Sequence, residues 1–245
     1  MNPPRLSVVI PAFNEAGRLP GSLARIREHL ERRTIAHEIL VVDDGSRDDT
    51  AARAESALAG AGRVLKNPGN RGKGYSVRRG MLEARGERRL MTDADLSAPI
   101  EELDALMGRM DEGFDVVIGS RALPGARIEV RQPLFRESMG RLFNLVVRTL
   151  VLPGLRDTQC GFKLFGAAAA QSVFSRARLN GFSFDVEALY LARLLGCRIA
   201  EVPVTWRNDA ATRVTLLRGT AAFLDVARVR WNAARGAYRR ARPTG

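Results

Sequence analysis

At 245 residues, the chain is long enough for one large α/β domain or two small ones. A hydrophobic fraction of 45% is typical of a protein with a sizeable core and argues against a disordered chain. Lysine and arginine outnumber aspartate and glutamate by 39 to 27, and the resulting net charge of +12 favours nucleic acid, an anionic membrane or phosphate-rich molecules as partners.

Short apolar runs alternate with amphipathic helical stretches over the first half of the chain. Strands are predicted at residues 6–10, 38–42, 63–66, 88–91 and 115–119. Helices are predicted at residues 19–33, from residue 49 onward and at 75–85, with Pro99 in the first turn of another. This alternation predicts a doubly wound, mostly parallel sheet, and the near-continuous Val/Ile runs indicate strands covered on both faces.

The pattern changes after Gly125. Residues 126–155 are basic and amphipathic, and a strand at 161–166 and a helix at 186–195 are predicted to follow. A late strand is predicted at 199–204, and a helix with a basic face from 216 to 242. Because we find neither an internal repeat nor a flexible linker, residues 1–245 are predicted to form one domain with a C-terminal helical elaboration.

No secretory signal is predicted at the N-terminus, because residues 1–5 lead directly into a strand. The longest apolar stretch, residues 142–155, is shorter than the roughly 20 residues that a membrane-spanning helix needs. The sequence therefore predicts a cytoplasmic protein, with peripheral attachment to the cytoplasmic membrane face left open.

Cysteine and histidine are scarce. Two cysteines are too few for a disulfide framework. The two histidines, His29 and His37, lie near no cysteine or carboxylate cluster in the sequence and are predicted to be surface residues. A Cys/His zinc site and a Ser-His-Asp triad are therefore excluded.

Polar residues gather at the carboxyl ends of the predicted strands, where open α/β sheets bind ligands. The clusters are Pro-Ala-Phe-Asn-Glu at 11–15, Asp-Asp-Gly-Ser at 43–46, Asp-Ala-Asp at 93–95 and Gly-Ser-Arg at 119–121. Any one cluster is explained equally well by turn formation, which favours Asp, Asn, Gly and Pro. Four clusters at the same edge favour a binding site.

Asp93 and Asp95 form the most informative cluster. Two carboxylates separated by one residue repel one another unless water or a cation lies between them. Their oxygen atoms suit Mg²⁺ or Mn²⁺, which keep coordination positions for substrate phosphates. Ser97 is a candidate additional ligand, directly or through water.

Asp43 and Asp44 are anions and suit hydrogen bonds to a base or a ribose better than contact with a diphosphate. Asp44 could instead cap the following helix.

The Gly-rich loop at 67–74 has neither Walker spacing nor a dinucleotide fingerprint, but its glycines permit close approach to a ligand. Arg71 and Lys73 add positive charge there, near a helix N-terminus.

These motifs together resemble those of family 2 glycosyltransferases with the GT-A fold. Asp-Thr-Gln-Cys-Gly-Phe-Lys at 157–163, Phe-Ser-Phe-Asp at 182–185 and Val-Pro-Val at 202–204 narrow the resemblance. They are similar to the polyprenyl-phosphate branch, which contains dolichyl-phosphate glucosyltransferases and dolichol-phosphate mannose synthases. The resemblance covers roughly residues 6–215 and is closer to the glucosyltransferases.

The resemblance implies a nucleotide-sugar-binding half at 6–125, an acceptor half at 126–215 and a basic C-terminal helix and tail at 216–245. The donor site that it implies consists of Pro11, Ala12, Phe13, Glu15, Val42, Asp43, Asp44, Lys73, Asp93, Ala94, Asp95, Arg121 and Arg213. The implied metal ligands are Asp93 and Asp95, and the implied catalytic residues are Asp95, Arg121, Asp157, Lys163 and Asp185.

The implied reaction is inverting transfer of a hexose from a nucleotide diphosphate sugar to a polyprenyl phosphate. UDP-glucose is the favoured donor and GDP-mannose the alternative, with Mg²⁺ or Mn²⁺ as the metal. Arg136 and Ser138 fall in the stretch that borders the acceptor phosphate in such enzymes, and 212–214 resembles a segment that closes over the diphosphate. Asp157 and Asp185 are candidate bases or orienting groups, or else structural caps.

Lys163 is a candidate contact for the acceptor phosphate. On that basis Lys163→Ala is expected to impair use of a lipid phosphate more than binding of the donor.

The apolar stretch at 142–155 is a candidate membrane contact, or alternatively core or a dimer contact. The C-terminal basic helix suits anionic headgroups.

The sequence leaves three alternatives to transfer of a sugar onto a polyprenyl phosphate. A glycosyltransferase that acts on a sugar hydroxyl needs a committed base, for which Asp185 is the candidate. A nucleotidyltransferase usually carries a Gly-rich stretch with Arg and Lys after its first strand, where this chain has Pro-Ala-Phe-Asn-Glu. Nucleic-acid binding is suggested by charge alone, and an aromatic content of 6% argues against it.

Overall fold

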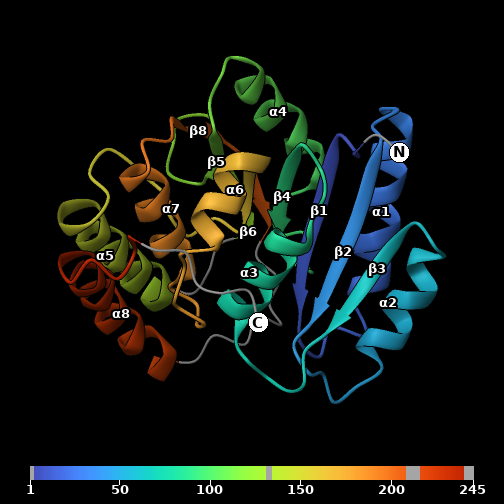
Figure 1. Cartoon of the computed structure of the whole chain (residues 1–245), viewed down its shortest axis with the longest axis horizontal. Helices are drawn as coiled ribbons and strands as arrows, with labels where there is room; N and C mark the ends of the chain where they lie inside the picture. The colour runs from blue at the N-terminus through green and yellow to red at the C-terminus, as the bar shows by residue number, and fades with distance from the viewer. Residues whose placement is uncertain (1–2, 131–133, 208–215, 240–245) are drawn as a thin grey trace.

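A seven-stranded sheet forms the centre of the computed structural model, which describes residues 3–130, 134–207 and 216–239 (Figure 1). The strands are β1 (Leu6–Ala12), β2 (His37–Asp43), β3 (Gly62–Lys66), β4 (Arg88–Thr92), β5 (Val116–Ser120), β7 (Phe162–Gly166) and β8 (Ile199–Pro203). Their order is β3-β2-β1-β4-β7-β5-β8, and β7 alone among them pairs antiparallel, with β4 and β5. The predicted mostly parallel sheet is confirmed.

Helices cover both faces of this sheet. One face packs against α1 (Leu19–Arg32), α2 (Thr50–Leu58) and α4 (Leu103–Asp111), which follows the short 3-10 helix η1 (Ile100–Glu102). The other face packs against α3 (Lys73–Glu83), α6 (Ala167–Phe174) and α7 (Phe184–Leu194).

Strand β1 shows why the apolar runs are continuous. Successive side chains of a strand point to opposite faces. Val8 and Ile10 therefore belong to the hydrophobic cluster under α1, while Val9 belongs to the cluster under α3. Because both faces are buried, every position of the strand favours an apolar side chain.

Helix α3 lies close to the sheet at Gly80. A Cβ at Gly80 would overlap Val9 and would lie 2.9 Å from Val42 Cγ2. Glycine inside a helix costs about 1 kcal/mol relative to alanine, so this close packing is the reason for glycine at the position. The Val42 side chain is fully buried beneath α3.

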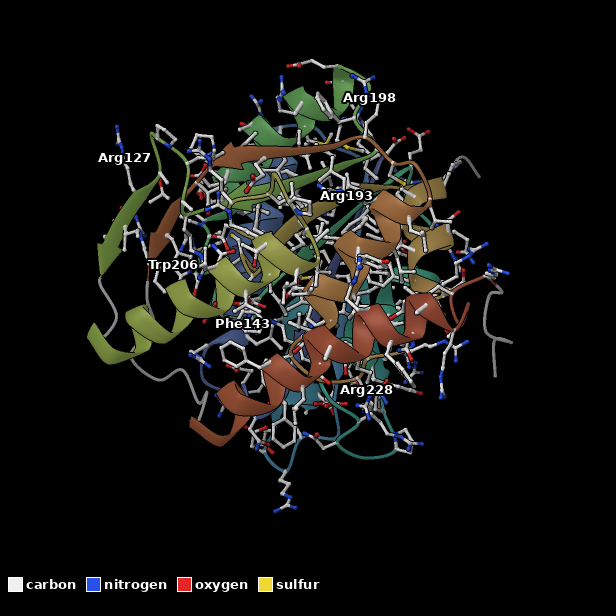
Figure 2. All side chains as sticks on the ribbon, turned by 90° about the vertical axis from the view of Figure 1, so that its left-hand side faces the viewer. Arg127, Phe143, Arg193, Arg198, Trp206 and Arg228 are labelled. Atoms are coloured by element: carbon white, nitrogen blue, oxygen red, sulfur yellow. The ribbon has the colours of Figure 1, made fainter. Side chains whose placement is uncertain are left out.

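The C-terminal half adds an outer layer beside α7. Helices α5 (Leu134–Leu150) and α8 (Leu216–Ala234) lie across one side of the molecule, and Phe143 of α5 meets Phe223 of α8 edge to face at 5.2 Å (Figure 2). Strands β6 (Arg127–Val130) and β9 (Thr205–Arg207) form a small parallel sheet. No helix in the described ranges is both long and apolar enough to span a bilayer.

Several details differ from the sequence-based expectations. Helix α3 begins at Lys73, two residues before the prediction, and α8 ends at Ala234 instead of continuing to 242. Pro99 precedes η1 and lies just outside it. The short elements α6, β6 and β9 were not predicted, because a helix of eight residues and strands of three or four carry little periodic signal.

The predicted surface position of His29 is wrong. His29 is 5% exposed, and its Nε2 lies 3.7 Å from Asp104 of α4. In an α-helix, residues three or four positions apart share a face. Ile26 precedes His29 by three residues and Leu30 by four, so all three belong to the buried side of α1.

Candidate active site

The carboxyl ends of β1, β2, β4 and β5 lie at one edge of the sheet, because these strands run in the same direction. Strand β7 runs the opposite way and begins at this edge, where Phe162 pairs with Thr92. The turn at 157–161 therefore lies beside the turns that follow β4 and β5. The structure brings the predicted polar clusters to this edge and places the turn before β7 among them.

Asp93 and Asp95 follow directly after β4. Asp95 Oδ1 accepts a hydrogen bond from the Ser97 backbone N–H (2.9 Å). The carbonyl oxygen of Ala94 accepts a hydrogen bond from Ser22 Oγ (2.7 Å), which fixes the turn to α1. Burial raises the pKa of Asp95, and the neighbouring Asp93 charge raises it further.

Asp93 is enclosed by a lysine and a glycine. Lys73 Nζ lies 2.5 Å from Asp93 Oδ1. The Gly161 backbone packs so closely against Asp93 Oδ2 that a Cβ at Gly161 would overlap this oxygen. Burial acts to lower the pKa of Lys73, but the charges of Asp93 and Asp185 outweigh it and keep this pKa above its usual value.

The acidic pair fits a hard divalent cation. Nowhere in the described ranges do three or more His, Cys, Asp or Glu side chains form a metal-binding group. Mg²⁺ in phosphate-transferring sites is usually held by one or two carboxylates, with water and substrate phosphates as the remaining ligands, and the same oxygen ligands suit Mn²⁺. Asp93 and Asp95 supply oxygen ligands of this kind.

Asp44 organises the Gly-rich loop. Its carboxylate accepts hydrogen bonds from Asn67 Nδ2 (2.8 Å) and from the backbone N–H groups of Arg71 (2.9 Å) and Gly72 (2.8 Å). The alternative that Asp44 caps the following helix is therefore wrong. Asn67 was missed by the sequence analysis, although its place as the first polar residue after β3 is the signal that marked the other strand ends.

The neighbouring Asp43 is also buried. Its Oδ1 accepts a hydrogen bond from the Ser46 backbone N–H (3.3 Å), and its carbonyl oxygen accepts one from the Asn67 N–H (2.8 Å). Asp43 thus holds its own turn together and joins the ends of β2 and β3.

The end of β1 and the turn after it contain four more of the predicted donor residues, Pro11, Ala12, Phe13 and Glu15. Ala12 is buried, Pro11 is half-buried and Phe13 is exposed at the rim. The Glu15 backbone N–H donates to Thr50 Oγ1 (2.8 Å), which fixes this turn to the start of α2. The Glu15 carboxylate pairs with Arg18 at 2.7 Å.

Arg121 and Asp157 form a bidentate ion pair. Arg121 Nε and Nη2 donate to Asp157 Oδ2 (2.7 Å) and Oδ1 (2.9 Å), and the Arg121 backbone N–H donates to Oδ2 (2.9 Å). Asp157 Oδ1 also accepts from the Gln159 N–H (3.1 Å), as the predicted turn cap requires. Burial acts to raise the pKa of Asp157, but Arg121 outweighs it and holds this pKa below its usual range.

The Arg121 guanidinium also lies over the Trp206 ring, 5.3 Å from its centroid. Burial acts against the charged form of Arg121, but Asp157 outweighs it and raises the pKa of Arg121. Because the group stays charged and is held by a carboxylate and an aromatic ring, its position at the site edge is well defined. Trp206 was not among the predicted site residues.

Lys163 and Asp185 form a second, deeper ion pair. Lys163 Nζ donates to Asp185 Oδ1 (2.5 Å) and to the carbonyl oxygen of Cys160. Lys163 is 1% exposed and Asp185 is 5% exposed. Burial raises the pKa of Asp185 against the opposing charge of Lys163. Neither group presents a side chain to an incoming substrate in this arrangement.

Some predicted site residues cannot be placed by their side chains. Arg213 and its neighbours at 212–214 fall outside the described residues. Arg136 and Ser138 lie in α5, in a stretch whose side chains are also outside the described part.

The family model of glycosyl transferase family 2 matches residues 7–174. The chain is 34% identical to a dolichyl-phosphate beta-glucosyltransferase of Dictyostelium discoideum over 241 residues, which covers 92% of this chain and 74% of that protein. It is 39% identical to a dolichyl-phosphate beta-glucosyltransferase of Mus musculus over 225 residues, with coverage of 86% and 69%.

Two solved structures have the same fold. Glucosyl-3-phosphoglycerate synthase of Mycobacterium tuberculosis, in complex with Mn²⁺, UDP and phosphoglyceric acid, matches with a TM-score of 0.70 at 21% identity, covering 94% of this chain and 78% of that one. Mannosyl-3-phosphoglycerate synthase of Rubrobacter xylanophilus matches with a TM-score of 0.71 at 20% identity, covering 99% and 78%. These similarities confirm the predicted GT-A fold.

Proposed function

This chain belongs to glycosyl transferase family 2, and we propose that it transfers glucose from UDP-glucose to a polyprenyl phosphate. The observation that carries the proposal is the position of Asp93 and Asp95, which lie together at the sheet edge beside Lys73. The relatives named dolichyl-phosphate beta-glucosyltransferase support glucose as the sugar and a lipid phosphate as the acceptor.

The reaction is a single in-line displacement. An oxygen of the acceptor phosphate bonds to the anomeric carbon, while the bond from that carbon to the donor β-phosphate oxygen breaks and UDP leaves with the electron pair. A phosphate monoester has a second pKa near 6, so it is largely dianionic at neutral pH and needs little help from a general base. The site must therefore hold two anionic groups close together.

Asp93 and Asp95 would hold Mg²⁺ or Mn²⁺ in this reaction. The cation, when bound, offsets the charge that develops on the leaving diphosphate. Lys73, at the first position of α3, and Arg121, after β5, supply further positive charge at the same edge. A guanidinium can grip a phosphate with two parallel hydrogen bonds.

Asp157 acts in this proposal as a positioning residue for Arg121. A carboxylate that already accepts hydrogen bonds from Arg121 and Gln159, and whose pKa is lowered, is a poor base. Asp185 is likewise paired with Lys163 and buried. This favours a phosphate acceptor over a sugar hydroxyl, because the hydroxyl would need an accessible base.

A donor and acceptor panel tests the function. The chain is incubated with UDP-glucose or GDP-mannose, Mn²⁺ and either a short polyprenyl phosphate or a soluble sugar acceptor, and the product is identified by its mass. We expect a product one hexose heavier from UDP-glucose. A product from a soluble sugar acceptor, with none from the lipid phosphate, would refute the proposed acceptor.

We also propose that α5 and α8 bind an anionic membrane surface, where a lipid acceptor resides. Leu224, Arg228 and Trp231 lie on one stripe of α8, since they are four and three residues apart. Leu224 is 75% exposed and Trp231 is 57% exposed. Figure 2 shows Arg228 on this face of the molecule, and on α5 the exposed Leu145 lies three residues before Arg148. Apolar side chains beside arginines suit a membrane interface.

Vesicle co-sedimentation tests this surface. Phosphatidylglycerol vesicles are expected to bind the chain more tightly than phosphatidylcholine vesicles, and salt to weaken the binding. The Leu224→Gln/Trp231→Gln variant should bind at least about tenfold more weakly, because burial of each large apolar side chain contributes about 1.5–3 kcal/mol. Leu195→Gln, an exposed leucine outside both helices, is the matched control. Equal binding by both variants would contradict the proposal.

A further inference from the structure

Lys73 lies among acidic groups at the candidate metal site. Its Nζ is 2.5 Å from Asp93 Oδ1, and Asp95 and Asp185 act on the same ammonium through their charges. The Lys73 side chain is 23% exposed, so it reaches the site surface, unlike the deeply buried Lys163. An ammonium thus lies directly against one of the two carboxylates that would hold a divalent cation.

The backbone around Lys73 is held firmly. Gly72 has a φ of +98°, and a Cβ there would overlap the carbonyl oxygen of Asn180. The Gly74 N–H donates to the same carbonyl oxygen (2.8 Å), and a Cβ at Gly74 would lie 2.7 Å from the carbonyl oxygen of Leu179. Because these contacts hold the backbone on both sides of Lys73, we expect displacement of the ammonium to come from rotation of the lysine side chain.

The two oxygens of Asp93 have different surroundings. Oδ2 lies against the Gly161 backbone, while Oδ1 is buried. Oδ1 faces Lys73. A cation that takes Oδ1 as a ligand therefore competes directly with the ammonium for the same oxygen.

We propose that Lys73 is an exchangeable cation, which neutralises Asp93 in the metal-free enzyme and gives this carboxylate up when a divalent metal binds. Once released, Lys73 faces Asp185 and the donor diphosphate, so its charge stays in the site. This inference rests on the proposed function only in taking Asp93 and Asp95 as the metal ligands. It predicts that Lys73 opposes metal binding and favours diphosphate binding.

If the ion pair between Lys73 and Asp93 is instead permanent, removal of Lys73 should have the opposite effect on metal binding. If Lys73 served only to hold Asp93 in the orientation that a metal requires, its removal would weaken metal binding. If Lys73 competes with the metal, its removal strengthens metal binding. The sign of the change in metal affinity therefore separates the two roles.

The test is Mn²⁺ binding to the donor-free protein, followed by electron paramagnetic resonance of the unbound ion. We expect Lys73→Met to lower the Kd for Mn²⁺ about tenfold, which corresponds to about 1.4 kcal/mol. Lys73→Gln, neutral but polar, should give the same direction, and Lys73→Arg should stay near wild type. Lys66→Met, which removes an exposed lysine paired with Glu55, is the matched control.

A Kd that is unchanged or higher in both Lys73→Met and Lys73→Gln would overturn the proposal. UDP binding in the presence of saturating Mn²⁺ provides a second readout, and it should weaken in both variants because the ammonium no longer faces the diphosphate. A wild-type Mn²⁺ affinity in Asp95→Asn would instead refute the metal ligands themselves. Failure of the exchange and failure of the proposed metal site are therefore distinguishable.

Discussion

Asp95→Asn is expected to abolish glycosyl transfer while the chain remains folded. The substitution removes one of the two carboxylates proposed to hold the divalent cation, and it keeps the size of the side chain. If the cation contributes about 4 kcal/mol to the transition state, its loss lowers the rate roughly a thousandfold. The melting temperature should stay the same or rise slightly, because burial and the Asp93 charge already disfavour an ionised Asp95.

Initial rates with UDP-glucose and a polyprenyl phosphate, together with a thermal melt, measure both effects. Asp49→Asn provides the matched control, since Asp49 is an exposed residue before α2 whose side chain makes no capping hydrogen bond. Chelation of divalent metal should reduce wild-type activity to the level of the variant. Full activity in Asp95→Asn, or in excess chelator, would remove the metal from the mechanism.

Lys163→Met is expected to destabilise the fold by about 3–5 kcal/mol, because it leaves Asp185 buried without its partner. For a chain of this size, that corresponds to a fall in melting temperature on the order of 10 °C. A buried ion pair by itself often adds little net stability, but an unpaired buried charge is costly. The double variant Lys163→Met/Asp185→Leu should therefore recover much of the loss.

Urea unfolding of the wild type and these variants measures the effect. Lys66→Met, at an exposed lysine that pairs with Glu55, should leave the free energy of unfolding nearly unchanged, because an exposed ion pair contributes little. If Lys163→Met were as stable as the wild type and lost only its use of lipid phosphate, the lysine would contact the acceptor, as the sequence analysis expects. An equal loss of stability in the single and double variants would also contradict the ion-pair explanation.

Much of the fold could be predicted because its signals are local. Val8, Val9 and Ile10 form an uninterrupted apolar run, which indicates a strand covered on both faces, and the intervening helices carry their own periodicity. The gathering of the polar clusters at one edge of the sheet could also be predicted. The residues after β1, β2 and β4 share one edge as soon as these strands are taken to be parallel.

Other residues were placed only by the folded chain. Asp44 suited either a ligand or a helix cap, and the structure uses it to hold the loop at 67–72. Lys163 suited a phosphate contact, but it lies beneath the site with Asp185, which follows it by more than twenty residues. Charge and residue type give no information about such a partner, because the pairing depends on which segments pack together.

The sequence by itself determined the α/β architecture, the acidic pair at a strand end and the family. Only the tertiary structure decided that β7 enters the sheet antiparallel between β4 and β5, which brings Asp157 to Arg121 and Gly161 to Asp93. Apolar periodicity is the same for either strand direction, and it carries no information about neighbours that are distant in the chain. Strand order and direction follow from how the helices and loops pack together, and for β7 that packing completes the site.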